Sequence, residues 1–302
     1  MAPTLFTGHK AAVYALVPGD APGTFLSADG SGAVVRWHLD RPDAGELVMQ
    51  AGEGIFSLHR PPARNMLWAG TEHGRLIVAD LHARREVATH HPHTKGIFAF
   101  ADLPGDRVAA AGGGGVLSVH APADGATVRE VPLSDGKLRC LAMDPAGAAL
   151  AVGANDGLVR VLEPVLLNET ATIQAHPAAP GPADRHTGCT AAAYHPRKPV
   201  LITGGKDGHL RLWRTDDRHR LLLELPAHQA AIYRIAFSPD GARFATAARD
   251  KSCLIWDAAD LDPIVRLDRA AGGHAHSVNT ALWAGDVLVT AGDDRTVRAW
   301  RP

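Results

Sequence analysis

Histidine is the residue type whose clustering in this chain could bind a metal. The clusters are His90, His91 and His93 in one stretch, and His274 and His276 in another. Imidazole nitrogens are common zinc ligands, but recognisable zinc patterns add cysteine or carboxylate ligands at set spacings. Neither stretch has such companions, and the first lies where a structural histidine of the repeat described below is expected. We therefore predict no metal site.

Glycine-rich turns are the second candidate chemistry, because backbone N–H groups in such turns can cradle phosphates. Residues 112–115 are four consecutive glycines, and Gly204, Gly205 and Lys206 form a shorter run. A phosphate cradle needs a following helix and a Lys-Ser/Thr pair, and both runs lack them. There is also no Gly-x-Ser-x-Gly nucleophile motif. The sequence therefore predicts no catalytic residue and no cofactor, and a protein that is not an enzyme.

Composition limits the class of partner. The 302 residues carry a formal net charge of −1, with 46% hydrophobic and 21% charged residues, which is typical of a globular domain. This charge gives no long-range attraction for nucleic acid or an anionic membrane. No apolar run approaches the roughly 18 residues that span a bilayer, and no secretory signal is evident. Three cysteines, an odd number in apolar segments, favour a reducing compartment, so we expect a cytoplasmic protein.

The elements that must position any site come from a repeat of about 42 residues that fills residues 1–302, which we interpret as a single domain. Four copies end on tryptophan and three weaker copies end on other residues, at Trp37, Ala79, His120, Leu162, Trp213, Trp256 and Trp300. In the sixth copy, the short apolar runs 232–237, 244–247 and 253–257 are separated by turn-forming residues. A fourth run, such as 47–49 or 221–223, precedes the next copy. Each copy therefore predicts a four-stranded antiparallel sheet that must pack against its neighbours.

The pattern of these residues resembles that of the WD40-repeat family, and it does not indicate a particular subfamily. Its pattern is a His near the start of a copy, a Ser or Thr, an Asp six residues before the terminal Trp, and that Trp. The resemblance implies a hydrogen-bonded tetrad of these four side chains in each regular copy. The matching residues here are His9, Ser27 and Trp37; Thr203, Asp207 and Trp213; His228, Thr246, Asp250 and Trp256; and His274, Thr290, Asp294 and Trp300.

Several copies depart from this pattern. Copies two, three and four lack the Trp and have His73, Gly114 and Asp156 at the Asp position. Copy one has Ser31 there, with Asp29 close by. Copy five offers both His176 and His186 as its motif histidine, on either side of a Pro/Gly-rich loop insertion at about 177–186.

The resemblance implies an all-β fold, a seven-bladed β-propeller of four-stranded antiparallel blades. The last copy ends near Trp300 without a fourth run, and Thr4–Phe6 precede the first copy unassigned. We therefore predict that this N-terminal strand pairs into the last blade and closes the ring, which removes an exposed sheet edge.

One position in the first strand of each copy could form a ring around the axis. It directly follows an apolar anchor four residues after the motif His, and it holds Tyr14, Phe56, Phe98, Arg139, Thr190, Tyr233 and Asn279. Aromatic residues and Arg are frequent interface anchors. In the family this position lies near the narrow mouth of the channel. The alternative is packing between blades, because strict strand alternation would place these aromatics on the same face as bulky core residues.

The predicted function is a non-enzymatic protein–protein interaction scaffold that binds partners at the mouth through Tyr14, Phe56, Phe98, Arg139, Tyr233 and Asn279. We expect no nucleic acid or membrane partner, and a domain that is monomeric. The alternatives are a propeller enzyme with a channel-mouth site and a structural subunit that binds through the blade rim or the copy-five loop.

Overall fold

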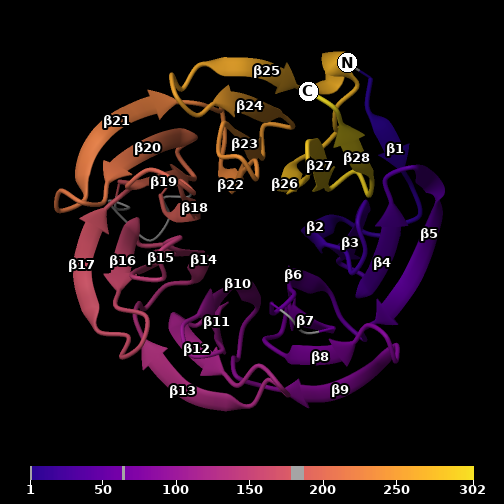
Figure 1. The fold of residues 1–302 in the computed structure, drawn as a ribbon, viewed down its shortest axis with the longest axis horizontal. Coiled ribbons are helices and arrows are strands. Elements are labelled where there is room, and N and C mark those ends of the chain that lie inside the picture. Colours follow the sequence, from indigo (N-terminus) through magenta and orange to yellow (C-terminus); the bar gives the residue numbers. More distant parts are fainter. Residues whose placement is uncertain (1, 63–64, 178–186) are drawn as a thin grey trace.

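The computed structural model describes residues 2–62, 65–177 and 187–302, which form seven four-stranded sheets around one axis (Figure 1). Each sheet is a blade, and all neighbouring strands within a blade are antiparallel. Blades one to four contain β2 (Val13–Pro18), β3 (Thr24–Asp29), β4 (Ala33–His38) and β5 (Arg41–Gln50); β6 (Ile55–His59), β7 (Met66–Thr71), β8 (Leu76–Asp80) and β9 (Arg85–His90); β10 (Ile97–Leu103), β11 (Arg107–Gly112), β12 (Val116–His120) and β13 (Thr127–Pro132); and β14 (Leu138–Met143), β15 (Leu150–Ala154), β16 (Leu158–Leu162) and β17 (Glu169–Gln174).

Blades five to seven complete the ring. They contain β18 (Cys189–Tyr194), β19 (Val200–Gly205), β20 (His209–Arg214) and β21 (Arg220–Pro226); β22 (Ile232–Phe237), β23 (Arg243–Ala248), β24 (Cys253–Asp257) and β25 (Pro263–Leu267); and β26 (Val278–Ala284), β27 (Val287–Gly292), β28 (Val297–Trp300) and β1 (Thr4–Phe6). The predicted fold class is confirmed. All seven predicted repeat ends lie in the third strand of their blade. Residues 178–186, which include most of the predicted copy-five insertion and His186, lie outside the described residues.

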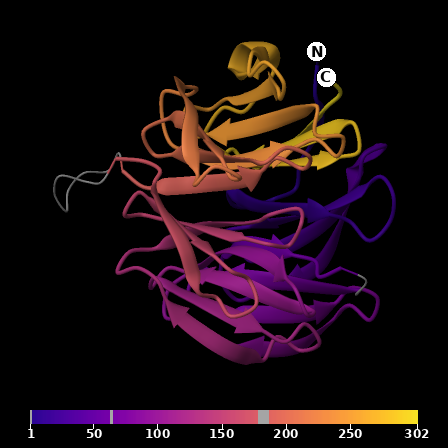
Figure 2. The ribbon, with the colours of Figure 1, turned by 60° about the vertical axis from the view of Figure 1, so that its left-hand side comes forward.

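The ring is closed by the N-terminal strand, as the sequence predicted. β1 pairs antiparallel with β28, with Thr4 opposite Ala299 and Phe6 opposite Val297. The innermost strands of the first and last blades, β2 and β26, also lie side by side. The two chain ends therefore lie close together in Figure 1 and Figure 2.

The core lies between the blades. Apolar residues of each blade pack against those of the next, so that Leu26 and Val34 of blade one share a cluster with Leu67 and Ile77 of blade two. This is the arrangement expected of sheets with two apolar faces that cannot be stable alone. The three cysteines, Cys140, Cys189 and Cys253, are buried free thiols in this core.

Helical structure in the described chain is limited to one 3-10 turn at Arg269–Ala271, so none of its helices is long enough to cross a membrane. The turn between the second and third strands of a blade requires a left-handed backbone. Glycine supplies it in blades one to five, for example Gly208 at φ 78°, whereas Lys251 and Arg295 adopt it in blades six and seven.

Candidate functional site

The innermost strands surround a central cavity of about 480 Å³. All seven residues of the ring position line it: Tyr14, Phe56, Phe98, Arg139, Thr190, Tyr233 and Asn279. The ring position is therefore at the channel, and six of its seven side chains are half-buried, while Thr190 is buried. We call this surface the mouth ring.

A β-bulge places each side chain of the mouth ring. In blade one, Val13 pairs with Asp29 but Ala15 pairs with Ala28, so Tyr14 is an extra residue without a partner. The same register shift occurs after the anchor residue in all seven blades. A bulge redirects the inserted side chain. The anchor Val13 and Leu16 consequently face the same way, and Tyr14 does not share a face with them, so strict strand alternation does not apply here.

Four neighbouring side chains of the mouth ring form a continuous arc over blades one to four. The rings of Tyr14 and Phe56 meet edge to face at 5.3 Å between centroids, and Phe56 stacks on Phe98 at 5.6 Å. The guanidinium of Arg139 then lies over the ring of Phe98, 4.2 Å from its centroid. Edge-to-face and stacked arrangements are favourable for aromatic pairs, and a cation over the face of a ring is favourable for a cation–π contact. The arc is a pre-assembled, half-buried aromatic surface ending in a cation.

The opposite side of the mouth ring joins blades to each other. The Thr190 hydroxyl donates to the Ile232 carbonyl at 2.5 Å, and the Asn279 amide donates to the Val13 carbonyl at 3.1 Å and to Asp293 Oδ1 at 2.7 Å. Thr190 and Asn279 are thus already engaged in structural hydrogen bonds. Tyr233 lines the cavity between them.

Charges around the mouth separate by sign. Burial raises the pKa of Tyr14, and the nearby carboxylates of Asp293 and Glu72 raise it further. Burial lowers the pKa of Lys206, and the cations of Arg139 and Lys137 add to that effect. One side of the mouth is therefore acidic and the side of blades four and five is basic.

The regular tetrads appear as hydrogen-bonded networks in blades six and seven. In blade six, the Trp256 indole donates to Thr246 Oγ1 at 2.9 Å, and His228 contacts the same oxygen at 2.7 Å and Asp250 at 3.1 Å. Blade seven repeats these contacts with Trp300, Thr290, His274 and Asp294 at 2.9, 3.0 and 2.9 Å. Burial alone would raise the pKa of Asp250, but the hydrogen bond with His228 holds it well below its usual range.

Blades one and five vary this network. In blade one, His9 contacts Ser27 at 2.6 Å and Asp29 at 2.8 Å, and Trp37 donates to Ser27 at 2.7 Å. Asp29 therefore supplies the carboxylate that the pattern expects at Ser31. In blade five, Trp213 donates to Thr203 at 3.0 Å and His176 contacts Asp207 at 3.0 Å, so His176 occupies the histidine position.

Blade three builds a different network, which the sequence pattern did not reveal. His93 contacts Ser118 at 2.8 Å, and Ser118 contacts His120 at 2.7 Å, so a serine of the third strand connects two buried imidazoles. The neighbouring Trp68 of blade two is fully buried and meets His120 edge to face. Burial lowers the pKa of both His93 and His120 to about 4. The feature of the sequence that could have indicated this network is Ser118, which lies two residues before His120, the last residue of the copy.

Replacing Thr246 by valine is expected to destabilise the fold by about 2–4 kcal/mol, because the Trp256 indole and His228 would lose the buried hydroxyl with which both form hydrogen bonds. The free energy of unfolding from urea titration measures this. The matched control is Thr94→Val, since Thr94 is exposed. Equal stability of the two variants would show that the blade-six tetrad contributes little.

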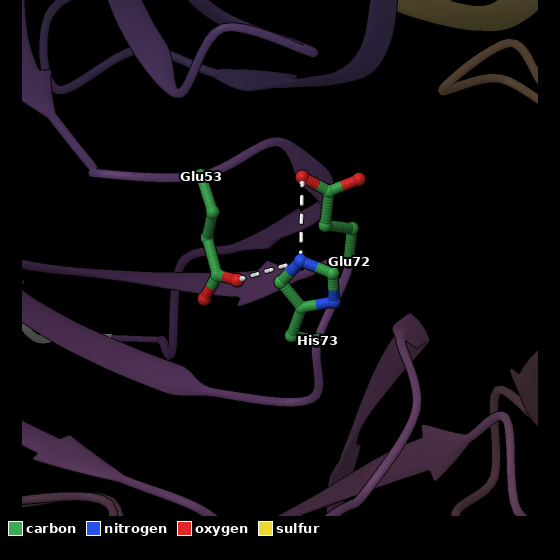
Figure 3. A group of neighbouring side chains, drawn as sticks. All are labelled: Glu53, Glu72 and His73. Atoms are coloured by element: carbon green, nitrogen blue, oxygen red, sulfur yellow. Dashed lines mark ion pairs between the residues drawn. The ribbon is translucent and has the colours of Figure 1, made fainter.

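The group Glu53, Glu72 and His73 brings three potential ligand atoms within 4.8 Å of one another (Figure 3). His73 Nε2 lies 3.8 Å from Glu53 and 4.0 Å from Glu72, and its side chain is mostly exposed. Glu53 is already paired with the Arg75 guanidinium, and Glu72 accepts the Gly54 N–H at 3.0 Å. The arrangement is that of an ion-pair cluster on the acidic side of the mouth, in which His73 is exposed and the two carboxylates are partly buried.

Comparison with known proteins gives two findings. The family model of the "WD domain, G-beta repeat" matches residues 183–214, 219–257 and 268–301, which correspond to the three most regular copies. Curated relatives include transducin beta-like protein 3 of Bos taurus, 30% identical over 170 residues that cover 53% of this chain and 20% of the relative. WD repeat-containing protein 1 of Gallus gallus is 26% identical over 57% of this chain and 29% of the relative. Protein HIR1 of Cryptococcus neoformans is 28% identical over 53% and 20%. This chain thus spans less than a third of the length of each of these relatives.

Proposed function

Because this chain is a WD40-repeat protein with the fold of a seven-bladed β-propeller, we propose that it is a non-enzymatic scaffold that binds a protein partner at the mouth ring. The contact residues are Tyr14, Phe56, Phe98, Arg139, Tyr233 and Asn279. The partner is a protein rather than nucleic acid or membrane, consistent with a net charge of −1, and the domain acts as a monomer in a cytoplasmic setting.

The observation that carries this proposal is the bulge-placed aromatic arc. Tyr14, Phe56 and Phe98 keep part of their surface accessible although they are packed against each other. Rigid aromatic side chains lose little conformational entropy when a partner covers them. Apolar partner side chains would pack on this arc, and the basic side of the mouth would pair with partner carboxylates.

The test is capture of partners by the wild type and by the triple variant Tyr14→Ala/Phe98→Ala/Tyr233→Ala. Because these side chains are partly exposed, we expect a folded variant that loses partners enriched by the wild type. The melting temperature and circular dichroism of each variant provide the folding check. A folded triple variant that retains every partner would contradict the mouth as the binding surface.

The blade rim is the second candidate surface, and a specific observation favours it. Leu221, Leu222 and Leu223 on β21, the outermost strand of blade five, have exposed fractions of 42%, 43% and 39%. Three adjacent exposed leucines on an edge strand are unusual without a covering partner. The variant Leu221→Ser/Leu222→Ser/Leu223→Ser is therefore compared with the mouth variant (Tyr14→Ala/Phe98→Ala/Tyr233→Ala) in the same capture experiment. Selective loss of partners from it would favour a structural subunit that binds through its rim.

The enzyme alternative would need acid, base and nucleophile from several blades. Among the residues that line the cavity, His59 belongs to a His–carboxylate pair, because its Nε2 lies 2.9 Å from Asp102 Oδ1. Among the described residues, no hydroxyl or thiol is hydrogen-bonded to this pair. The pair therefore lacks the nucleophile contact that covalent catalysis requires, and the scaffold is the better supported function.

A further inference from the structure

Arg234 is the exceptional residue of the central cavity. It lies two residues after the blade-six anchor, next to Tyr233 of the mouth ring. The equivalent residue is small in the other six blades, and these residues also line the cavity: Ala15, Ser57, Ala99, Cys140, Ala191 and Thr280. Blade six therefore places one long cationic side chain at a level of the channel where every other blade has a small one.

Arg234 is solvent-accessible, yet desolvation by the surrounding protein lowers its pKa. These two properties agree only if its accessible surface lies inside the channel rather than on the outside of the molecule. Arg139, which lines the same cavity from blade four, is half-buried and its pKa is also lowered by burial. Two arginines thus line one cavity.

The cavity lining also includes the carboxylate of Asp293, which accepts a hydrogen bond from the Asn279 amide and is not paired with either arginine. Over the described ranges 2–62, 65–177 and 187–302, neither Arg139 nor Arg234 forms an ion pair or a hydrogen bond, and the Arg139 Nε is buried without a partner. Two other half-buried arginines do have such partners, because Arg160 pairs with Asp156 and Arg298 with Asp294, both at 2.9 Å. A desolvated cation without a counter-charge is unfavourable, so an unoccupied pair of this kind creates a positive potential in the cavity.

We propose that the central cavity, which both Arg139 and Arg234 line, binds a small oxyanion, a phosphate or carboxylate group. Guanidinium groups match such oxyanions through paired N–H donors. The cavity volume of about 480 Å³ is within the range of small-molecule sites. The basic side of the mouth, with Lys137 and Lys206 close to Arg139, attracts a soluble anion to the cavity. This site goes beyond the proposed function, because its ligand is a small molecule; it shares Arg139 with the mouth ring and adds Arg234, which follows Tyr233 on β22.

The experiment uses the full chain, with inorganic phosphate and succinate as separate probes against sodium chloride of equal ionic strength. Isothermal titration calorimetry and thermal unfolding both report binding. We expect saturable heat and a higher melting temperature with at least one probe and not with chloride. A response to phosphate alone identifies a phosphoryl ligand, and a response to succinate alone identifies a carboxylate ligand. Absence of a saturable response to either probe overturns the proposal.

Arg234→Met is the decisive variant. Removing an unpaired desolvated cation should leave the anion-free melting temperature unchanged or raised, while the affinity for the probe falls at least about tenfold. Arg234→Lys should retain part of the affinity. Arg249→Met, which removes an exposed cation from blade six, is the matched control and should bind the probe as the wild type does. Unchanged affinity of Arg234→Met, or its failure to fold without anion, would overturn the assignment. Partner capture by the mouth variant is independent of these outcomes.

Discussion

Replacing Phe6 by alanine is expected to lower the free energy of unfolding of the whole domain by about 3–5 kcal/mol, the usual cost of truncating a buried phenylalanine. Phe6 lies on β1, the strand that completes blade seven, but its fully buried ring contacts Phe25 and Trp37 of blade one at 5.3 and 5.6 Å between centroids. This side chain therefore fastens the last blade to the first, and ring closure depends on it.

Leu5→Ala is the matched control for Phe6→Ala, because Leu5 is on the same strand and 46% exposed. It should change stability by about 0.5 kcal/mol or less. Deleting residues 1–7 removes the pairing of β1 with β28 as well as the Phe6 contacts, and should destabilise the domain more than either substitution. A truncated chain with the melting temperature of the full chain would show that β1 does not hold the ring closed.

Lowering the pH from 6.5 toward 4 is expected to destabilise the fold through the two buried histidines of blade three. Burial holds the pKa of His93 and of His120 at about 4, below the usual 6.5. Between these values the unfolded chain binds protons that the folded chain does not, so stability is full above pH 6.5 and falls as the pH decreases. The maximum loss is about 3 kcal/mol for each histidine.

Urea unfolding at a series of pH values measures this effect, with His120→Phe as the diagnostic variant. Phenylalanine is apolar and keeps a ring beside Trp68, so about half of the blade-three contribution to the pH dependence should disappear. His276→Ala is the control, because His276 is exposed. Carboxylates whose pKa is lowered, such as Asp29, add a further loss only below about pH 3.8. A His120→Phe variant with the wild-type pH profile would contradict this account.

The predicted ring of aromatic residues shows what periodicity can and cannot predict. Recurrence at equivalent positions is sufficient to place Tyr14, Phe56 and Phe98 around one axis, because rotationally related blades bring equivalent residues to the same radius. Alternation along a single strand was a poor guide to their direction. A bulge is created by pairing with the second strand of the blade, and the sequence of the first strand does not encode that register by itself.

The departures of blades one and three from the regular hydrogen-bonded network also reflect contacts that a linear pattern does not contain. Asp29 supplies the carboxylate for His9 in blade one, and Ser118 connects His93 with His120 in blade three. A buried polar group needs a partner within hydrogen-bond distance, but not at a fixed spacing along the chain. Sequence spacing therefore recognises only the regular copies, whereas three-dimensional proximity completes the irregular ones.

The amino-acid sequence by itself determined the number of blades, their four-stranded composition and the closure by β1, because these depend on local periods of apolar and turn-forming residues. Only the tertiary structure decided which side chains share an environment. Arg139 and Arg234 come from blades four and six, and their local sequence does not indicate that both line one cavity without an ion-pair partner. Burial, charge pairing and cavity shape are properties of residues distant in the chain, and they exist only when the ring is closed.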